Sequence, residues 1–103
     1  MFVVTLKFAD KSKAPPLMDG HNAWIARGFD EGVFLLVGGL QPSLGGAIVA
    51  HGASRAEIEA RVADDPFVRE GVVSADVIEI APGRADARLE FLMASDPEPP
   101  PAR

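Results

Sequence analysis

The stretch VFLLVGGLQPSLGGAIVA, residues 33–50, predicts a β-hairpin in the middle of the chain. Its first part, residues 33–40, is a dense run of β-branched, aliphatic and aromatic side chains, which is typical of a strand. Residues 41–46 contain a proline and the Gly45-Gly46 pair, so we expect a loop of hairpin length there. A short strand over residues 47–50 completes the hairpin.

A strand and a helix precede the hairpin. Residues 2–8 (FVVTLKF) alternate between two faces, which is the period of a strand. Pro15-Pro16 fits the first turn of a helix, and Glu31-Gly32 ends it. We interpret Trp24 and Phe29 as core residues of this helix. The positions that recur at helical spacing are Leu17, His21, Trp24, Ile25, Gly28 and Phe29.

A second helix and a last strand follow the hairpin. Ser54, with Glu57 three residues later, forms a capping box, which predicts that a helix begins there. The Asp65-Pro66 pair ends this helix, because the residue before a proline is disfavoured in the helical conformation. Residues 72–80 are rich in apolar, β-branched side chains, so we expect a fourth strand that ends at Pro82-Gly83.

The resulting element order is βαββαβ. Crossovers between strands are right-handed, and the two central strands form a hairpin, so one simple topology fits this order. We therefore expect an α+β, ferredoxin-like sandwich, with two helices on one face of a four-stranded antiparallel sheet. This domain is expected to cover residues 1–83.

Residues 84–103 are expected to form a C-terminal extension. Residues 84–93 have both helical and strand character, and the sequence leaves that choice open. The segment SDPEPPP at 95–101 should be extended and poorly ordered. It reads either as a solvated end or as a ligand for a proline-recognition domain.

Composition excludes several classes of protein. The chain has 103 residues, of which 48% are hydrophobic and 24% charged, so we expect one globular domain. Its net charge is −5 and its basic residues form no run, so we expect no nucleic-acid partner. The absence of cysteine excludes disulfides, thiolate catalysis and cysteine-based metal sites.

The N-terminal stretch does not have the pattern of a targeting segment. No basic region precedes its short apolar run, so we expect no signal peptide. No stretch approaches the roughly 20 apolar residues of a membrane span. We therefore expect a cytoplasmic protein without a membrane partner.

Two of the expected strands carry apolar residues on both faces. The helices can cover only one face of the sheet, and soluble monomers rarely leave a large apolar patch open to water. We therefore expect a homodimer that packs sheet against sheet. The residues concerned are Val33, Leu35 and Val37 against Phe34 and Leu36, and Val73, Ala75 and Val77 against Ile78 and Ile80.

His21 and Asp65 are the two residues whose placement suits acid–base chemistry. His21 lies on the buried stripe of the first helix, as either a core-edge histidine bonded to backbone or a general acid or base. Asp65 precedes Pro66, where it can cap a short helical turn, act with the histidine, or do both, because a carboxylate has two oxygens.

We predict no metal or cofactor site. The other histidine, His51, reads as a surface residue at the end of a strand. No two histidines are four residues apart and cysteine is absent, so the spacing of metal ligands is missing. The Gly38-Gly39 and Gly45-Gly46 pairs do not precede a helix as a phosphate-binding loop would.

These motifs together resemble the YCII-related (YciI-like) family over roughly residues 1–82. The most specific of them is Asp-Pro-Phe, at residues 65–67, shortly before a Gly-Val strand. The segments that carry the resemblance are FVVTL at 2–6, His21 with its apolar helix, GVFLLVGGL at 32–40, GGAIV at 45–49, the capped helix from Ser54, and ADDPFVREG at 63–71.

The resemblance implies a ferredoxin-like dimer with a pocket between the first helix and the sheet, near the dimer interface. It also implies that His21 and Asp65 are the active pair. Members of the family are similar to muconolactone isomerase-type proteins, and some eliminate chloride from chlorinated hydroquinones.

Three functions are consistent with the sequence. The first is a cofactor-free lyase or isomerase for a small molecule, in which His21 transfers a proton and Asp65 orients it. The second is a non-catalytic accessory protein that binds a small metabolite. The third is a dimeric scaffold in which both polar residues are structural. No residue identifies the substrate.

Overall fold

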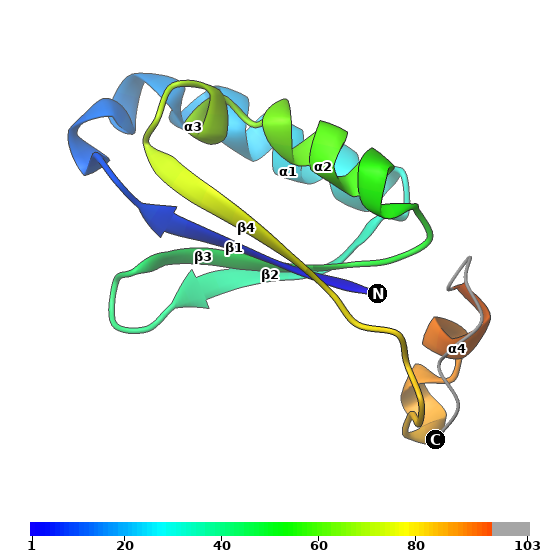
Figure 1. The fold of residues 1–103 in the computed structure, drawn as a ribbon. Helices are drawn as coiled ribbons and strands as arrows, with labels where there is room; N and C mark the ends of the chain where they lie inside the picture. Colours follow the sequence, from blue (N-terminus) through cyan, green and yellow to red (C-terminus); the bar gives the residue numbers. More distant parts are fainter. Residues whose placement is uncertain (96–103) are drawn as a thin grey trace.

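The computed structural model describes residues 1–95, and it contains one antiparallel sheet with helices over one of its faces (Figure 1). The proline-rich segment predicted at 95–101 lies outside the described residues from position 96 on. The strands are β1 (Phe2–Phe8), β2 (Phe34–Leu40), β3 (Gly45–Ala50) and β4 (Val73–Glu79). The helices over the sheet are α1 (Met18–Asp30), α2 (Arg55–Ala63) and α3 (Pro66–Arg69).

The sheet has the strand order β2-β3-β1-β4, and every neighbouring pair is antiparallel. The first and last strands of the domain therefore lie side by side, and the β2–β3 hairpin forms the other edge. Together with the element order, this topology confirms the predicted ferredoxin-like α+β fold.

The core lies between the sheet and the helices. The helix-facing side of β1 is buried at Phe2, Val4 and Leu6, as the alternation of this strand predicts. From the helices, α1 contributes Trp24, whose side chain is 1% exposed, and its indole Nε1 donates a hydrogen bond to the backbone oxygen of Arg61 at 2.9 Å. This bond ties α1 to α2.

The predicted capping box begins α2. The Ser54 hydroxyl accepts a hydrogen bond from the backbone N–H of Glu57, and the Glu57 carboxylate accepts one from the backbone N–H of Ser54. The hydrogen bonds from Ser54 hold the pKa of the Glu57 carboxyl below its ordinary value. A local pattern of four residues thus fixes where this helix starts.

Phe29 was predicted to be a core residue, and that prediction is wrong. Its side chain is 44% exposed, while the preceding Gly28 is buried against β2. A Cβ atom on Gly28 would lie 2.1 Å from the ring of Phe34, so only glycine fits at this contact. The ring of Phe34 fills the place that a larger side chain on α1 would otherwise occupy.

The loop predicted at 41–46 is shorter than expected, because β3 begins at Gly45 and includes the glycine pair. Gly45 has a φ of +134°, which favours glycine. A Cβ atom there would lie 1.9 Å from the backbone oxygen of Leu6. The pair thus allows close approach between strands, and the turn itself spans residues 41–44.

The predicted faces of β2 are also wrong in part, because a β-bulge interrupts the strand. Phe34 is paired with Ala50 and Leu36 with Val49, so Leu35 is an extra residue. After the bulge, Leu36 lies on the face opposite to the helices. Side-chain alternation, which the sequence-based assignment assumed, does not hold across such an insertion.

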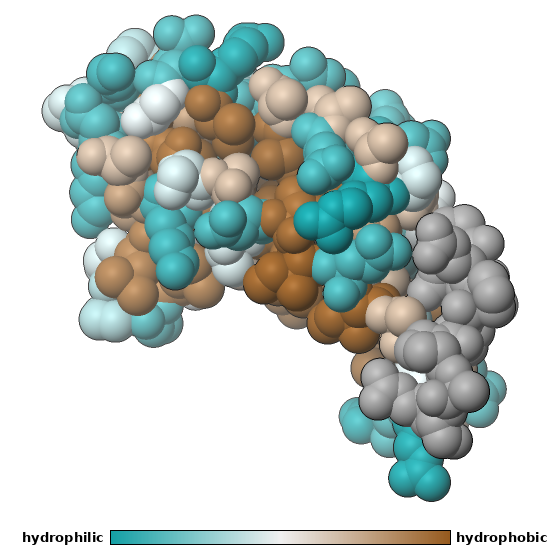
Figure 2. Space-filling view, viewed as in Figure 1, coloured by the Kyte–Doolittle hydropathy of each residue, from teal (hydrophilic) through white to brown (hydrophobic). Residues whose placement is uncertain are grey.

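The outer face of the sheet carries an apolar row that crosses all four strands. Leu36 pairs with Val49, Val49 with Val3, and Val3 with Ile78. Leu36 is 59% exposed and Ile78 is 50% exposed. Figure 2 shows hydrophobic surface over β4 and continuing past its end, where Ile80 is also exposed.

Beyond the sheet, the sequence left open whether residues 84–93 form a helix or a strand. The two elements that the structure shows in this region are both helical. A short 3₁₀ helix (Ala87–Leu89) is followed by α4 (Phe91–Ser95). Phe91 meets the ring of His51 edge to face at 5.5 Å between centroids. His51, predicted to lie at the surface, is consequently half-buried. Within residues 1–95, no helix has the length and apolar character needed to cross a membrane.

Candidate active site

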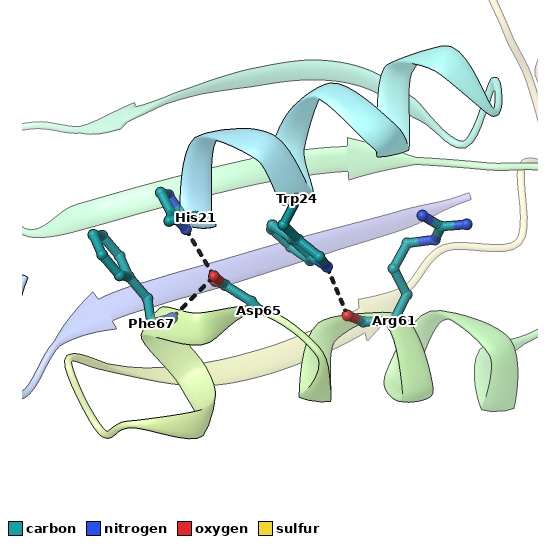
Figure 3. Close-up of polar contacts among 5 residues, drawn as sticks. All are labelled: His21, Trp24, Arg61, Asp65 and Phe67. Carbon is teal, nitrogen blue, oxygen red and sulfur yellow. Dashed lines mark hydrogen bonds and ion pairs between the residues drawn. The ribbon is translucent and has the colours of Figure 1, made fainter. Parts of the chain in front are cut away.

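His21 and Asp65 lie next to one another although 44 residues separate them in the chain. Nδ1 of His21 is 2.8 Å from Oδ1 of Asp65 (Figure 3). The His21 side chain is 13% exposed and that of Asp65 is fully buried. One residue comes from α1 and the other from the junction between α2 and α3. The fold thus joins the two predicted site residues, and the partner of the imidazole is a carboxylate rather than a backbone group.

The local conformation of Asp65 follows from the proline after it. Asp65 is extended, with φ −63° and ψ 124°, and Pro66 occupies the first position of α3. In this conformation the carboxylate accepts a hydrogen bond from the backbone N–H of Phe67 at 3.0 Å. Asp65 therefore caps α3, as its sequence context predicts, and contacts His21 with the same oxygen.

This shared oxygen determines which ring nitrogen of His21 carries the proton. Oδ1 of Asp65 already accepts from the backbone of Phe67, and a carboxylate oxygen acts as an acceptor. Nδ1 of His21 is therefore the donor in the contact. In the neutral imidazole this leaves Nε2 with a free lone pair.

Phe67 holds the plane of the imidazole ring, a role that the sequence did not suggest. The rings of His21 and Phe67 are parallel within 4°, with centroids 3.9 Å apart. The indole of Trp24 lies further away, at 6.0 Å between centroids. The only sequence signal was the Asp-Pro-Phe motif itself, since the phenylalanine follows the capping proline. A ring fixed by one hydrogen bond and one stacked face has little rotational freedom.

A hollow of about 220 Å³ opens beside His21, between α1 and the sheet. Its polar side chains are His21 and Asn22, and the rest of its wall is apolar side chains and glycine backbone. This volume is below the ~300–1,000 Å³ typical of sites for drug-sized ligands, so the hollow suits a molecule of about one ring. Its apolar and glycine lining consists of Leu6, Phe8, Met18, Ile25, Val37, Gly38, Gly45, Gly46, Ala47, Ile48, Phe67 and Val73.

Glycines in the sheet create part of this space. Gly46 pairs with Leu6 and so lies on the helix-facing side of β3, where a larger residue would project towards His21. Gly45-Gly46 was expected to belong to the loop of the hairpin, whereas the structure places both glycines in β3, at the wall of the hollow. Strand alternation would have indicated one further lining residue, because it places Phe8 on the helix-facing side at the end of β1.

His51 does not belong to this site. It follows the last residue of β3, at the opposite end of that strand from Gly45 and Gly46. In the part of the chain that the structure describes, no three or more histidines and acidic residues gather in a group that could hold a metal ion.

Comparison with known proteins identifies the family of this chain. A search of curated proteins finds no match to the chain. A family model described as the YCII-related domain matches residues 1–81, which include both β1 and the Asp-Pro-Phe motif. This match confirms the resemblance predicted from the sequence. The chain belongs to the YCII-related domain family.

Proposed function

We propose that this protein is a small-molecule lyase or isomerase in which the His21–Asp65 pair transfers a proton. The observation that carries the proposal is the 2.8 Å contact between Nδ1 of His21 and Oδ1 of Asp65, at the wall of an apolar hollow. A histidine with one nitrogen bound to a buried carboxylate and the ring at a hollow has the arrangement of a general base.

In this mechanism Nε2 of His21 removes a proton from the substrate. Asp65 holds the imidazole in the tautomer that leaves Nε2 free, and it stabilises the imidazolium that forms. The same imidazolium then returns the proton, either to another atom of the substrate in an isomerisation or to a leaving group in an elimination. The apolar wall limits competing reactions with water.

The environment of Asp65 supports a role beyond helix capping. Its Oδ2 atom is buried and has no hydrogen-bond partner among the described residues. A buried polar atom without a partner costs about 1–3 kcal/mol. Serine or asparagine would also cap α3, and neither would bury an ionisable carboxyl group, so the aspartate at this buried position is better explained by its contact with His21.

The proposal is tested in two steps. A panel of small metabolites is screened for compounds that raise the melting temperature, and each hit is checked for conversion by mass spectrometry. With a verified substrate, His21→Gln and Asp65→Asn should each lower kcat/KM by about 10²–10⁴, the usual contribution of general acid–base catalysis. His51→Gln is the matched control, because it removes the histidine outside the hollow.

Unchanged turnover in His21→Gln would reject the mechanism. Stabilising hits without any conversion would favour the alternative of an accessory protein that binds a metabolite. A loss of stability in His21→Gln, with no ligand for the unmodified protein, would favour a purely structural pair.

We further propose that the protein acts as a homodimer that packs sheet against sheet. The support is the apolar row on the outer face of the sheet, which includes the half-exposed Ile78 and the more exposed Leu36. Such a patch is self-complementary across a two-fold axis, which is the commonest symmetry of soluble oligomers.

A further inference from the structure

A second, more open hollow adjoins the one at His21. It has a volume of about 550 Å³ and lies at the end of β1, next to the start of α1. Phe8, Met18 and Phe67 line both hollows, so these three side chains separate an inner chamber from an outer one. A ligand that occupies both chambers would have to pass these three side chains.

Among the described residues that line either hollow, Lys11 is the only lysine, arginine, aspartate or glutamate. Its ammonium lies over the ring of Phe8, with Nζ 4.7 Å from the ring centroid. Across residues 1–95, no carboxylate forms an ion pair with Lys11; the carboxylate of neighbouring Asp10 accepts hydrogen bonds from Ser12 instead. The outer chamber therefore presents an uncompensated cation beside an aromatic wall.

The turn that carries Lys11 is fixed to the body of the domain. The backbone N–H groups of Ala9 and Asp10 both donate to the backbone oxygen of Val72, at 2.8 and 3.0 Å. On the far side of the turn, Nζ of Lys13 donates to the backbone oxygen of Glu70 at 3.4 Å. These bonds hold the backbone of the turn, and with it the point from which the Lys11 side chain extends, next to the outer chamber.

We propose that Lys11 selects an anionic ligand: a single-ring compound whose ring enters the inner chamber and whose carboxylate reaches the ammonium in the outer one. The inference rests on the proposed function in taking the hollow at His21 as the ligand site. Charge complementarity supports it, because the chain as a whole has a net charge of −5 and repels anions elsewhere. The Lys11 ammonium in the outer chamber attracts anions locally, against the overall negative charge of the chain.

The test uses three carboxylates of increasing reach, benzoate, phenylacetate and 3-phenylpropionate, each with its neutral amide. Binding is measured by calorimetry, and its place by amide shifts of Gly38 and Gly46 in NMR spectra. For at least one pair, the carboxylate should bind about five- to tenfold more tightly than the amide, the size expected for a partly exposed charge pair. Added salt should reduce this preference.

In Lys11→Gln the carboxylate should lose its advantage, while the affinity for the amide stays the same. Lys7→Gln is the matched control: it removes an equal charge near the end of β1, at an exposed residue that lines neither hollow. The proposal is overturned if no pair shows a preference in the unmodified protein, if Lys11→Gln keeps the preference, or if Lys7→Gln abolishes it equally.

These outcomes are independent of the catalytic proposal, since binding is measured without turnover. Loss of the preference in Lys11→Gln, together with unchanged turnover in His21→Gln, would retain the anion site and reject proton transfer. If Lys11→Gln kept the preference for the carboxylate while His21→Gln lost turnover, the anion site would be rejected and proton transfer retained.

Discussion

At the scale of single residues, Asp65 combines two roles that are usually separate. Its Oδ1 atom accepts two hydrogen bonds, one from the backbone N–H of Phe67 in α3 and one from the imidazole of His21. The start of α3 therefore fixes the direction in which the carboxylate meets the histidine. A helix cap acts here as a positioning device for the second member of the pair.

Substitutions at Asp65 should separate its polar contacts from its charge. Asp65→Ala leaves both the Phe67 N–H and Nδ1 of His21 without an acceptor in a buried place, so unfolding free energy should fall by about 1–3 kcal/mol. Asp65→Asn keeps an oxygen acceptor and should lose less. Urea unfolding measures both variants. If Asp65→Ala and Asp65→Asn lost the same unfolding free energy, the charge of the carboxylate, and not its role as an acceptor, would stabilise the fold.

The sequence predicts His21 and Asp65 as candidate site residues, but it does not predict which residues surround them. Both residues carry local signals, a polar position on an apolar helical stripe and an aspartate before proline. Phe67 stacks on the imidazole only because α3 and α1 are neighbours in the fold. Gly46 opens space because β3 pairs with β1. Such roles depend on long-range pairing, which no local pattern contains.

At the scale of elements, the packing of α1 on β2 depends on the lack of a side chain at Gly28. The ring of Phe34 occupies that space, and the same ring meets the indole of Trp24 edge to face at 5.2 Å between centroids. The helix is therefore closer to the sheet here than an alanine would allow.

Gly28→Ala should destabilise the protein even though alanine favours helices by about 1 kcal/mol over glycine. The added Cβ would lie 2.1 Å from the Phe34 ring, and overpacking of this kind costs about 1–3 kcal/mol. Denaturant unfolding checks the sign. Combining Gly28→Ala with Phe34→Leu should recover part of the lost unfolding free energy. A Gly28→Ala variant more stable than the unmodified protein would contradict this packing.

Element boundaries with local signals were predictable from the sequence, and others were not. The capping box at Ser54 defines the start of α2, and Asp65-Pro66 defines the start of α3. The bulge at Leu35 is different, because it exists only relative to the partner strand. Leu36 was consequently grouped with Phe34, although the two side chains lie on opposite faces of the sheet.

At the scale of the whole molecule, the outer face of the sheet is the surface with the clearest consequence. The proposed dimer predicts that light scattering finds twice the chain mass at micromolar concentration. Ile78→Lys places a charge in the apolar row and should shift the protein towards monomer. Ala60→Lys, on exposed α2, adds the same charge away from the sheet and should leave the dimer intact. A monomeric unmodified protein would contradict the proposal.

The global fold was predictable because its elements alternate in a way that permits few topologies. The apolar pattern of residues 2–8 and the hairpin at 33–50 defined the sheet, and the right-handed crossover rule supplied the rest. The C-terminal segment follows no such rule. Its helix α4 lies beside His51 through a contact between Phe91 and the imidazole ring, which neither residue signals alone.

Two side chains of α1, one turn apart, hold that helix to the segment that runs from α2 into α3. His21 bonds to Asp65, and Trp24 bonds to the backbone of Arg61 (Figure 3). Separating the helices would break both bonds and part His21 from Asp65. A wider hollow that keeps both bonds would therefore need a change elsewhere in the lining, and the β2–β3 hairpin contributes Gly38, Gly45 and Gly46 on the sheet side.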